Sequence, residues 1–435
     1  MPIVMPRQSI QGPINSTAML DSKALSDYQG MVSAQYIAQN QPEKRQSRQL
    51  FVDISALVQI DLKTGIQRVT RSILKELLEN PPQGYRVEPV YATNYQVGYR
   101  YARNFTLHFL NCPCGQIEDA PIEVAQGDVF LGLDWQPVIV FTQRNFLNYI
   151  RRFGVCVYFV VYDLLPVLMP HVFVNGVATG FSRWLQTISS FDGALCISRS
   201  VADDLHEWMN NNVAVRMHQF HIGWFHLGSD IENSAPTVGL PNDANTILCK
   251  MEKNPSFLMV GTLEPRKGHL QTLAAFEKLW TENMQVNLFI VGKQGWVVDM
   301  LANRLKNHKE LGKRLFWLED VSDEYLEKLY SAATCLLTAS EGEGFGLPLI
   351  EAARRKLPII ARDIPVFREI AGQHAYYFTG LDDGSLAETI IQWIKLYEKD
   401  CVPSPEGMPV LSWSESTVNL LDSLLNKNWY VSCIQ

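Results

Sequence analysis

One segment decides the fold class: Thr338-Ala-Ser-Glu-Gly-Glu-Gly-Phe-Gly-Leu-Pro-Leu-Ile-Glu351. The apolar run at 335–337 before it is typical of a strand, the glycines at 342, 344 and 346 indicate a loop, and Pro348 is expected to open a helix. Proline is tolerated in a first helical turn, where its missing N–H costs nothing. The free N–H groups of that turn and the glycine backbone should face one spot, which would attract an anion.

Two carboxylates flank this spot, Glu343 in the loop and Glu351 in the first turn of the expected helix. An acidic residue in a first turn is often only a helix cap, so Glu351 alone carries little weight. Glu343 between two glycines is more specific, because the glycines let the backbone approach a ligand while one charged side chain points to a definite place. Carboxylates beside an anion site suit a ligand that carries both hydroxyls and phosphate.

Strand-like and helix-like segments alternate from residue 50 onward, which predicts parallel sheets covered by helices. The expected strands are 51–54, 129–133, 156–161, 193–197, 257–260, 287–291, 315–318, 335–338, 358–361 and 375–378. The expected helices are 67–78, 144–152, 181–190, 200–209, 269–280, 297–308, 323–331, 348–356, 365–370, 385–397 and 412–425. The fold class is therefore α/β, with doubly wound sheets.

The chain is longer, at 435 residues, than one hydrophobic core usually supports, so two main domains are expected. Periodicity fades between 229 and 256, where Pro, Asn, Asp and Ser accumulate and a linker is predicted. The expected divisions are a polar extension with one short helix near 24–38, two Rossmann-like domains and a final helical segment: 1–49, 50–245, 246–410 and 411–435. In doubly wound folds a ligand would bind between the domains, beyond the carboxyl ends of the strands.

Composition excludes several classes of protein. A net charge of −7 argues against a general nucleic-acid binder, which needs a basic face. The sequence lacks both a run of roughly 18 to 20 apolar residues and a charged-then-apolar start. Its eight cysteines are scattered, several within apolar runs, which predicts a cytoplasmic protein in a reducing compartment. Peripheral contact with the inner face of the cytoplasmic membrane through basic residues at 304–314 stays open, since a solvated face explains those charges equally well.

A second motif follows the expected strand at 257–260 and reads Gly261-Thr-Leu-Glu-Pro-Arg-Lys-Gly268. Arg266 and Lys267 precede a helix expected near His269, where the helix dipole is already positive. Two cations there favour a bound phosphate, and a planar guanidinium beside a point charge suits a diphosphate. A solvated Arg-Lys turn is the simpler alternative.

The main rival for the glycine-rich loop is a dinucleotide-binding fingerprint, which also joins strand, glycine turn and helix. Asp363 nearly fits the acidic residue that such a fingerprint places about twenty positions on. However, Leu347 stands where the third glycine belongs, and the loop lies near the end of the second αβ block. Hydride-transfer chemistry is therefore disfavoured.

Taken together, these motifs resemble the C-terminal domain of retaining GT-B glycosyltransferases of family 4. The resemblance rests on 261–268, on 343–351 and on Ile360-Ala-Arg-Asp-Ile-Pro-Val-Phe-Arg-Glu369. Upstream, Thr64-Gly-Ile-Gln-Arg-Val69 is similar to the loop after the first strand in a bacterial subgroup that builds O-antigen, capsule or other exopolysaccharides. Residues 162–166, 196–198 and 227–230 are similar to further landmarks, and 412–425 to a helix that crosses back to the N-terminal domain. A GT-B fold with a central cleft is implied.

The resemblance also implies roles for matched residues. Arg266 and Lys267 would neutralise the donor diphosphate, Glu343 would contact the donor sugar, and Glu351 would hold the nucleotide ribose. Asp163 is the expected group on the acceptor side. Further donor contacts would come from Gly65, Val321, Gly344, Phe345, Gly346 and Leu347.

Histidine and metal chemistry are not favoured. Tyr162 stands where many family members carry a histidine beside the reacting sugar, so no catalytic histidine is assigned. His171 is expected to be a solvated or capping residue. Neither the Cys112 and Cys114 pair nor the histidines at 218, 221 and 226 have the spacing of paired zinc ligands.

The implied reaction moves a hexose from a nucleotide diphosphate to a hydroxyl of a glycan or lipid-linked glycan, with retained configuration. GDP-mannose is the preferred donor, while UDP-hexoses and dTDP-rhamnose stay open. No cofactor or metal is expected, because the two cations and the helix N-terminus would stabilise the leaving group. The alternatives are a catalytically silent sugar-nucleotide-binding module and another GT-B enzyme, a phosphorylase or an epimerase.

Overall fold

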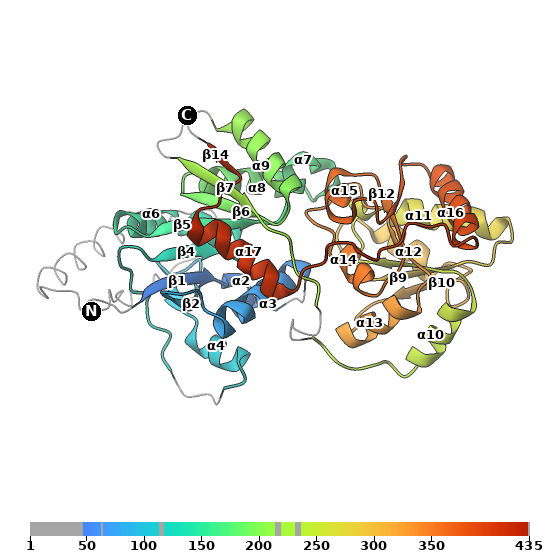
Figure 1. The fold of residues 1–435 in the computed structure, drawn as a ribbon, viewed down its shortest axis with the longest axis horizontal. Helices are drawn as coiled ribbons and strands as arrows, with labels where there is room; N and C mark the ends of the chain where they lie inside the picture. Colours follow the sequence, from blue (N-terminus) through green and yellow to red (C-terminus); the bar gives the residue numbers. More distant parts are fainter. Residues whose placement is uncertain (1–46, 62–63, 113–116, 214–218, 231–235, 434–435) are drawn as a thin grey trace, which may run out of the picture.

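The computed structural model describes residues 47–61, 64–112, 117–213, 219–230 and 236–433. Within these ranges the chain forms two sheets flanked by helices (Figure 1). The strand order is β14-β7-β6-β5-β4-β1-β2-β3 in the first sheet and β10-β9-β8-β11-β12-β13 in the second. The predicted α/β class with two doubly wound, Rossmann-like units is confirmed.

The first sheet is parallel except at its two edges, where β3 and β14 run antiparallel to their neighbours. Its strands are β1 (Arg48–Asp53), β2 (Tyr85–Tyr91), β3 (Arg100–Tyr101), β4 (Val129–Gly132), β5 (Cys156–Val161), β6 (Gly193–Cys196), β7 (Phe220–Trp224) and β14 (Val431–Cys433). The helices around it are α2 (Ser55–Gln59), α3 (Gly65–Glu79), α4 (Arg103–Phe109), α5 (Pro137–Thr142), α6 (Arg144–Arg152), α7 (Leu165–Leu168), α8 (Val177–Ile188) and α9 (Arg199–Asn212), with a 3-10 turn at Pro170–Val172. Central strands such as β5 read as continuous apolar runs because helices cover both faces.

The second sheet is parallel throughout. Its strands are β8 (Ser256–Val260), β9 (Asn287–Val291), β10 (Leu315–Leu318), β11 (Cys335–Thr338), β12 (Ile359–Arg362) and β13 (Tyr376–Phe378). Its helices are α10 (Ala244–Lys253), α11 (His269–Thr281), α12 (Asp299–Lys306), α13 (Asp323–Ala332), α14 (Leu347–Arg354), α15 (Pro365–Ala371) and α16 (Asp383–Tyr397), and a 3-10 turn at Pro265–Lys267 precedes α11. No helix in the described ranges has the length and apolar character required to cross a bilayer.

Two local predictions were wrong. The interval expected to be a linker contains α10, whose buried Ala244, Ile247 and Met251 pack toward α13. Glu351 lies in the second turn of α14, not the first, because the helix already begins at Leu347. It begins there because Gly346, with φ 109°, supplies the left-handed N-cap. The predicted helix near 24–38 lies outside the described residues.

The last helix returns to the first sheet, as predicted. α17 (Trp413–Asn426) packs against α3 and β7, and Figure 1 shows it, in red, lying along the first domain. A capping box fixes its start, since Ser412 and Glu415 exchange hydrogen bonds. Trp413 is 1 % exposed and its backbone touches Gly228 of the first domain. This contact joins the beginning of α17 to the loop after β7.

The approach of Trp413 to Gly228 gives a test of this crossing. A Cβ on Gly228 would lie 2.5 Å from the Trp413 backbone nitrogen, so Gly228→Ala forces the two segments apart. We expect a loss of about 1–3 kcal/mol in the free energy of unfolding, measured in urea. Gly180→Ala is the matched control, because its Cβ would meet nothing within 4 Å in α8. Equal stability of both variants would contradict the contact.

Candidate functional site

The candidate site lies where two neighbouring strands end. β8 and β11 pair in parallel, so the turn after β8 and the loop after β11 meet at one edge of the second sheet. Gly268 makes the meeting possible: its φ is 71°, and a Cβ there would lie 2.3 Å from the Ala339 carbonyl oxygen. The topology thus brings the two sequence motifs, about 75 residues apart in the chain, side by side.

Glu343 lies between the two predicted cations. Its Oε1 is 2.5 Å from Lys267 Nζ, and its Oε2 is 3.0 Å from Arg266 Nη1. The same Nη1 donates to the Gly342 carbonyl at 2.7 Å, and Arg266 Nη2 lies 2.9 Å from Glu264. All four charged side chains are at most 16 % exposed. Two cations are therefore balanced by two carboxylates in a site largely removed from water.

These neighbours set the protonation of Glu343. Burial alone would raise its pKa, but Lys267 and Arg266 outweigh burial and lower the pKa to about 2. Glu343 is consequently ionised at neutral pH. Burial raises the pKa of Glu264 above its ordinary value, with Arg266 opposing it. Of the two carboxylates, Glu343 therefore stays ionised to lower pH than Glu264.

The glycine-rich loop is pressed against the first domain. A Cβ on Gly344 would lie 1.9 Å from the Tyr162 carbonyl oxygen, and one on Gly342 would lie 2.7 Å from Met169 Sδ. Ser198 Oγ also donates to the Gly344 carbonyl at 2.8 Å. Glycine at 344 therefore permits the backbones of the two domains to touch, and glycine at 342 leaves room for the Met169 and Leu165 side chains.

Asp163 faces this loop from the first domain. Burial raises its pKa while Arg266 opposes the shift, and its Oδ1 accepts from the Leu165 N–H at 2.9 Å. Tyr162 beside it is buried, and its hydroxyl donates to the Leu133 carbonyl at 2.7 Å. The Tyr162 hydroxyl is therefore bonded within its own domain.

Glu351 has partners that sequence reasoning missed. Its Oε1 accepts from Arg68 of α3 at 2.6 Å, and its Oε2 accepts from the Tyr330 hydroxyl at 2.6 Å. Arg68 also pairs with Asp323 at 2.7 Å, so one guanidinium of the first domain joins two helices of the second. Each Glu351 oxygen still has a second lone pair. Arg68 belongs to the 64–69 motif, but the sequence of that motif does not indicate which side chain Arg68 binds.

The remaining predicted donor residues lie on elements of both domains. Gly65 opens α3, and a Cβ on it would have only Leu347 Cδ1 as a neighbour, at 4.0 Å. Gly346 is the cap of α14, packed near Phe367. Val321 follows β10 and packs against the hydrophobic core. Gly65 and Leu347 therefore meet across the domain boundary, as a site built from both domains requires.

A second interdomain contact centres on Glu369. Its carboxylate accepts from the backbone N–H groups of Arg199 and Ser200 at 2.7 and 2.8 Å, and thus caps α9 of the first domain. His226 Nε2 lies 2.7 Å from the same carboxylate and contacts the Phe345 ring at 5.6 Å. Burial would raise the pKa of Glu369, but these hydrogen bonds lower it. The sequence placed Glu369 in a family motif without this role.

The other histidines do not converge. His221 Nδ1 lies 2.9 Å from Ser432 Oγ and its ring stacks on Trp429, while His218 lies outside the described residues, as does Cys114. Within the part of the chain that the structure describes, no three His, Cys, Asp or Glu side chains are grouped to hold a metal. His269 was missed as a site residue: it is 2 % exposed beside Lys267, and burial lowers its pKa to about 3.

The space at the charged centre is small. Lys267, His269, Ser340, Glu343 and Phe367 help to bound a cavity of about 20 Å³, enough for about one water molecule. In this closed arrangement Glu343 fills the position between the cations.

Comparison with known proteins adds the following. Residues 246–404 match the family model "Glycosyl transferases group 1", so this part of the chain carries such a domain. The chain is 44 % identical over 405 residues to the serotype-specific mannosyltransferase WbdA of Escherichia coli, covering 92 % of this chain and 48 % of WbdA. It is 34 % identical over 233 residues to the O-antigen chain mannosyltransferase RfbU of Salmonella typhimurium LT2, covering 53 % and 58 % of the two chains. The chain thus spans about half the length of the curated relatives that it matches.

Solved structures share the fold. The structure of Anabaena HepE in complex with UDP-glucose superposes with a TM-score of 0.59 at 15 % identity, covering 86 % of this chain and 100 % of that one. Sucrose-phosphate synthase from Thermosynechococcus elongatus gives a TM-score of 0.55 at 16 % identity, covering 87 % and 97 %. The two-domain arrangement is therefore that of GT-B glycosyltransferases.

The ion pairs of Glu343 predict a pH-dependent contribution to stability. Its pKa of about 2 in the folded chain lies below the ordinary 4.5, so the stabilisation is complete above about pH 4.5 and is lost as the pH falls toward 2. Glu343→Gln removes the charge at every pH. We expect it to lower the free energy of unfolding by about 3 kcal/mol near pH 6, and the difference from wild type to shrink below pH 4.5.

Urea unfolding at a series of pH values checks this, with Glu398→Gln as the control at an exposed carboxylate. If the loss in free energy of unfolding caused by Glu343→Gln stays constant from pH 7 to pH 3, the ion pairs of Glu343 are not the source of that stability.

Proposed function

We propose that this chain is a retaining mannosyltransferase of glycosyltransferase family 4, in the bacterial polysaccharide subgroup that shares the 64–69 loop. It would transfer mannose from GDP-mannose to a hydroxyl of a glycan or lipid-linked glycan. The observation that carries the proposal is the partly buried pair of cations, Arg266 and Lys267, in the turn after β8 in a group 1 domain. The mannosyltransferase relatives support the choice of sugar.

The donor diphosphate would replace the Glu343 carboxylate on the cations. A diphosphate carries more negative charge than one carboxylate, so it would compete effectively for Arg266 and Lys267. Glu343, once displaced, would lie beside the phosphates with free acceptor oxygens for the sugar hydroxyls. The backbone N–H groups at the start of α14, from Gly344 to Leu347, would face the same phosphates.

Binding a donor requires the loop to separate from the first domain. The cavity of about 20 Å³ is far smaller than a nucleotide sugar, and Gly344 already touches the Tyr162 backbone. We infer that the domains open for donor entry and close again around the donor, with Gly65 approaching the phosphates and Glu351 using its remaining lone pairs on the ribose. Val321 lies after β10 on the side proposed for the base.

The chain's residues favour front-face attack. The bond from the anomeric carbon to the phosphate oxygen breaks as the acceptor oxygen bonds to the same face, and the acceptor proton passes to the departing phosphate. Arg266, Lys267 and the N-terminus of α14 would stabilise the charge that develops on the leaving group. Asp163 would position the acceptor. A double displacement would require a carboxylate at the anomeric carbon, and trapping of a sugar covalently bound to the chain would establish that route instead.

The proposed setting is the cytoplasm, with no metal or other cofactor needed. Peripheral contact with the membrane that holds a lipid-linked acceptor would involve the basic residues of α12, Arg304 and Lys306.

A donor panel tests the activity. Purified chain is incubated with GDP-mannose, UDP-hexoses or dTDP-rhamnose and a mannose-terminated acceptor, and the product linkage is assigned by NMR. GDP-mannose turnover with an α-linked product is expected. Turnover of another donor would refute the choice of sugar, and no release of nucleotide from any donor would favour a silent binding module.

Lys267→Ala removes one of the two cations that would hold the leaving diphosphate. We expect mannose transfer to fall by about two to three orders of magnitude with the fold retained, because leaving-group stabilisation is lost. Lys278→Ala on α11, whose partner Asp383 lies outside the site, is the control. Unchanged transfer by Lys267→Ala, confirmed as folded by circular dichroism, would contradict the diphosphate assignment.

Gly65→Ala separates ligand binding from stability. Only Leu347 lies within 4 Å of the added Cβ, and alanine is the better helix former, so stability should be equal to wild type or higher by less than about 1 kcal/mol. The methyl group would crowd the donor phosphates, and we expect the Kd for GDP-mannose to rise about tenfold or more by calorimetry. Donor affinity equal to that of wild type would place the phosphates away from α3.

A further inference from the structure

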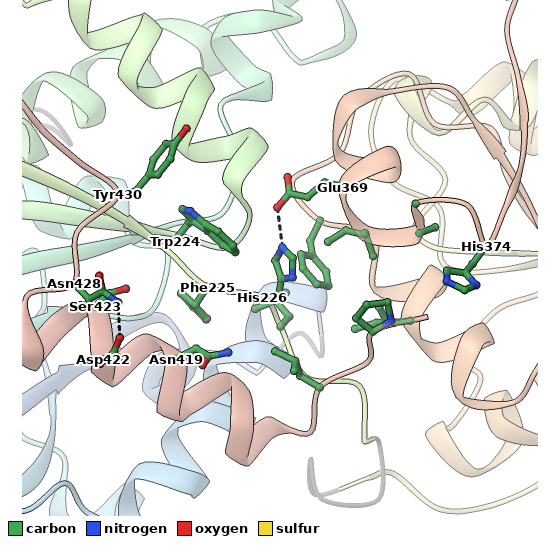
Figure 2. Close-up of a pocket in the computed structure, with 18 of the residues that line it drawn as sticks. Trp224, Phe225, His226, Glu369, His374, Asn419, Asp422, Ser423, Asn428 and Tyr430 are labelled. Carbon is green, nitrogen blue, oxygen red and sulfur yellow. Dashed lines mark hydrogen bonds and ion pairs between the residues drawn. The ribbon is translucent and has the colours of Figure 1, made fainter. Parts of the chain in front are cut away.

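A large cavity in the described residues lies outside the charged centre. It measures about 820 Å³, and its lining includes residues 224–227 at and after the end of β7, 369–374 at and after the end of α15, and Asn419, Asp422, Ser423 and 428–430 on and after α17. We call it the crossover groove. Figure 2 shows that its lining comes from both domains, with Asn419 and Asp422 of α17 on one side and Glu369 on the other. It therefore occupies the side of the domain boundary along which α17 crosses.

Aromatic rings form much of its first-domain wall. Trp224 is partly exposed and packs against His226 with the ring centres 5.0 Å apart. Trp429 is held between Tyr158 and His221, at 5.2 and 5.1 Å. The Trp224 ring, fixed in this way and partly exposed, offers a flat apolar face at little entropic cost.

Among the described residues, some polar groups of the groove lack a hydrogen-bond partner, and another is held in place by neighbouring amides. Within the described ranges, neither the Trp224 indole N–H nor the Asn419 side-chain amide has a hydrogen-bond partner, and both line the cavity. The Asp422 carboxylate is fixed by the amides of Asn426 and Asn428 at 2.9 and 2.8 Å. Each of its oxygens keeps a lone pair for another donor. The groove thus offers donors and acceptors at set places between the rings.

The charge of the lining excludes anions. The groove is lined by Glu369 and Asp422 but by no lysine or arginine. Arg199 is not part of the lining, although its guanidinium lies 5.6 Å from the centre of the Tyr430 ring. Nucleotides and phosphorylated lipids would therefore meet repulsion. Rings that stack on apolar C–H faces, amides and a carboxylate that bind hydroxyls, and the absence of lysine and arginine from the lining together fit a neutral, polyhydroxylated ligand.

We propose that the crossover groove binds a neutral oligosaccharide, at a site separate from the cleft that holds Arg266 and Lys267. The class of ligand follows from the groove itself, whereas the choice of a mannose oligomer rests on the proposed function. Phe345 connects the two places: its backbone belongs to the glycine-rich loop, while its ring lines the groove. A bound glycan would therefore touch the reverse side of the donor loop and retain the chain on a growing polymer.

The proposal is tested by measuring the binding of linear α-mannotetraose to the full chain. Titration calorimetry and ligand-observed NMR detect the binding. Trp224→Ala removes the stacking face and should weaken binding about tenfold. Asn419→Ala removes an exposed side chain that the fold does not use, and should weaken binding about threefold to tenfold. The matched controls are Tyr95→Ala and Asn303→Ala, an exposed ring and an exposed helical asparagine elsewhere, which should bind as wild type does.

The outcomes separate this proposal from the proposed function. Mannotetraose binding that survives in Lys267→Ala and weakens in Asn419→Ala supports the groove, whether or not GDP-mannose is turned over. No binding to the folded wild type at millimolar mannotetraose would overturn it. Binding that Lys267→Ala abolishes, or that Asn419→Ala and Trp224→Ala leave unchanged, would also overturn it by placing the sugar elsewhere. If Trp224→Ala does not fold, Asn419→Arg serves as the second groove variant.

Discussion

The position of Glu343 between Arg266 and Lys267 is the interaction on which the rest of the site depends. Two cations at the end of a strand, before the positive end of a helix, would repel one another in a place with little water. The loop carboxylate removes that repulsion and fixes the loop after β11 against the turn after β8. With the loop held there, Gly344 can meet the Tyr162 backbone of the first domain.

At the boundary between the domains, charged side chains of one domain likewise pair with groups of the other. Arg68 of α3 holds Glu351 and Asp323, and Glu369 caps α9 across the boundary. Glu351 belongs to the candidate donor site and Glu369 lies near it, so each contact joins that site or its surroundings to the opposite domain. Opening the cleft would break them together, so donor binding and domain movement should be linked through the same side chains. In this view Glu343 is an internal partner of the cations that the donor diphosphate would replace.

Sequence reasoning recovered the parts of the molecule that local pattern controls. β5 and β9 were predicted at their observed bounds, because buried parallel strands are short apolar runs between turn signals. Arg266, Lys267 and Glu343, which the structure brings into contact, could be singled out because their loops follow strands that are easily recognised. α10 was missed, since Pro, Asn and Asp before it mask a helix whose burial depends on α13. Arg68 and Glu369 were quoted without roles, because their partners lie across a domain boundary that one-dimensional spacing does not encode.

The most direct measurement of the central claim is a crystal structure of the chain with GDP-mannose bound. Our account predicts the diphosphate on Arg266 and Lys267, with Glu343 released from both cations and directed toward the sugar hydroxyls. A bound donor whose phosphates lie elsewhere, with the Glu343 ion pairs intact, would contradict it.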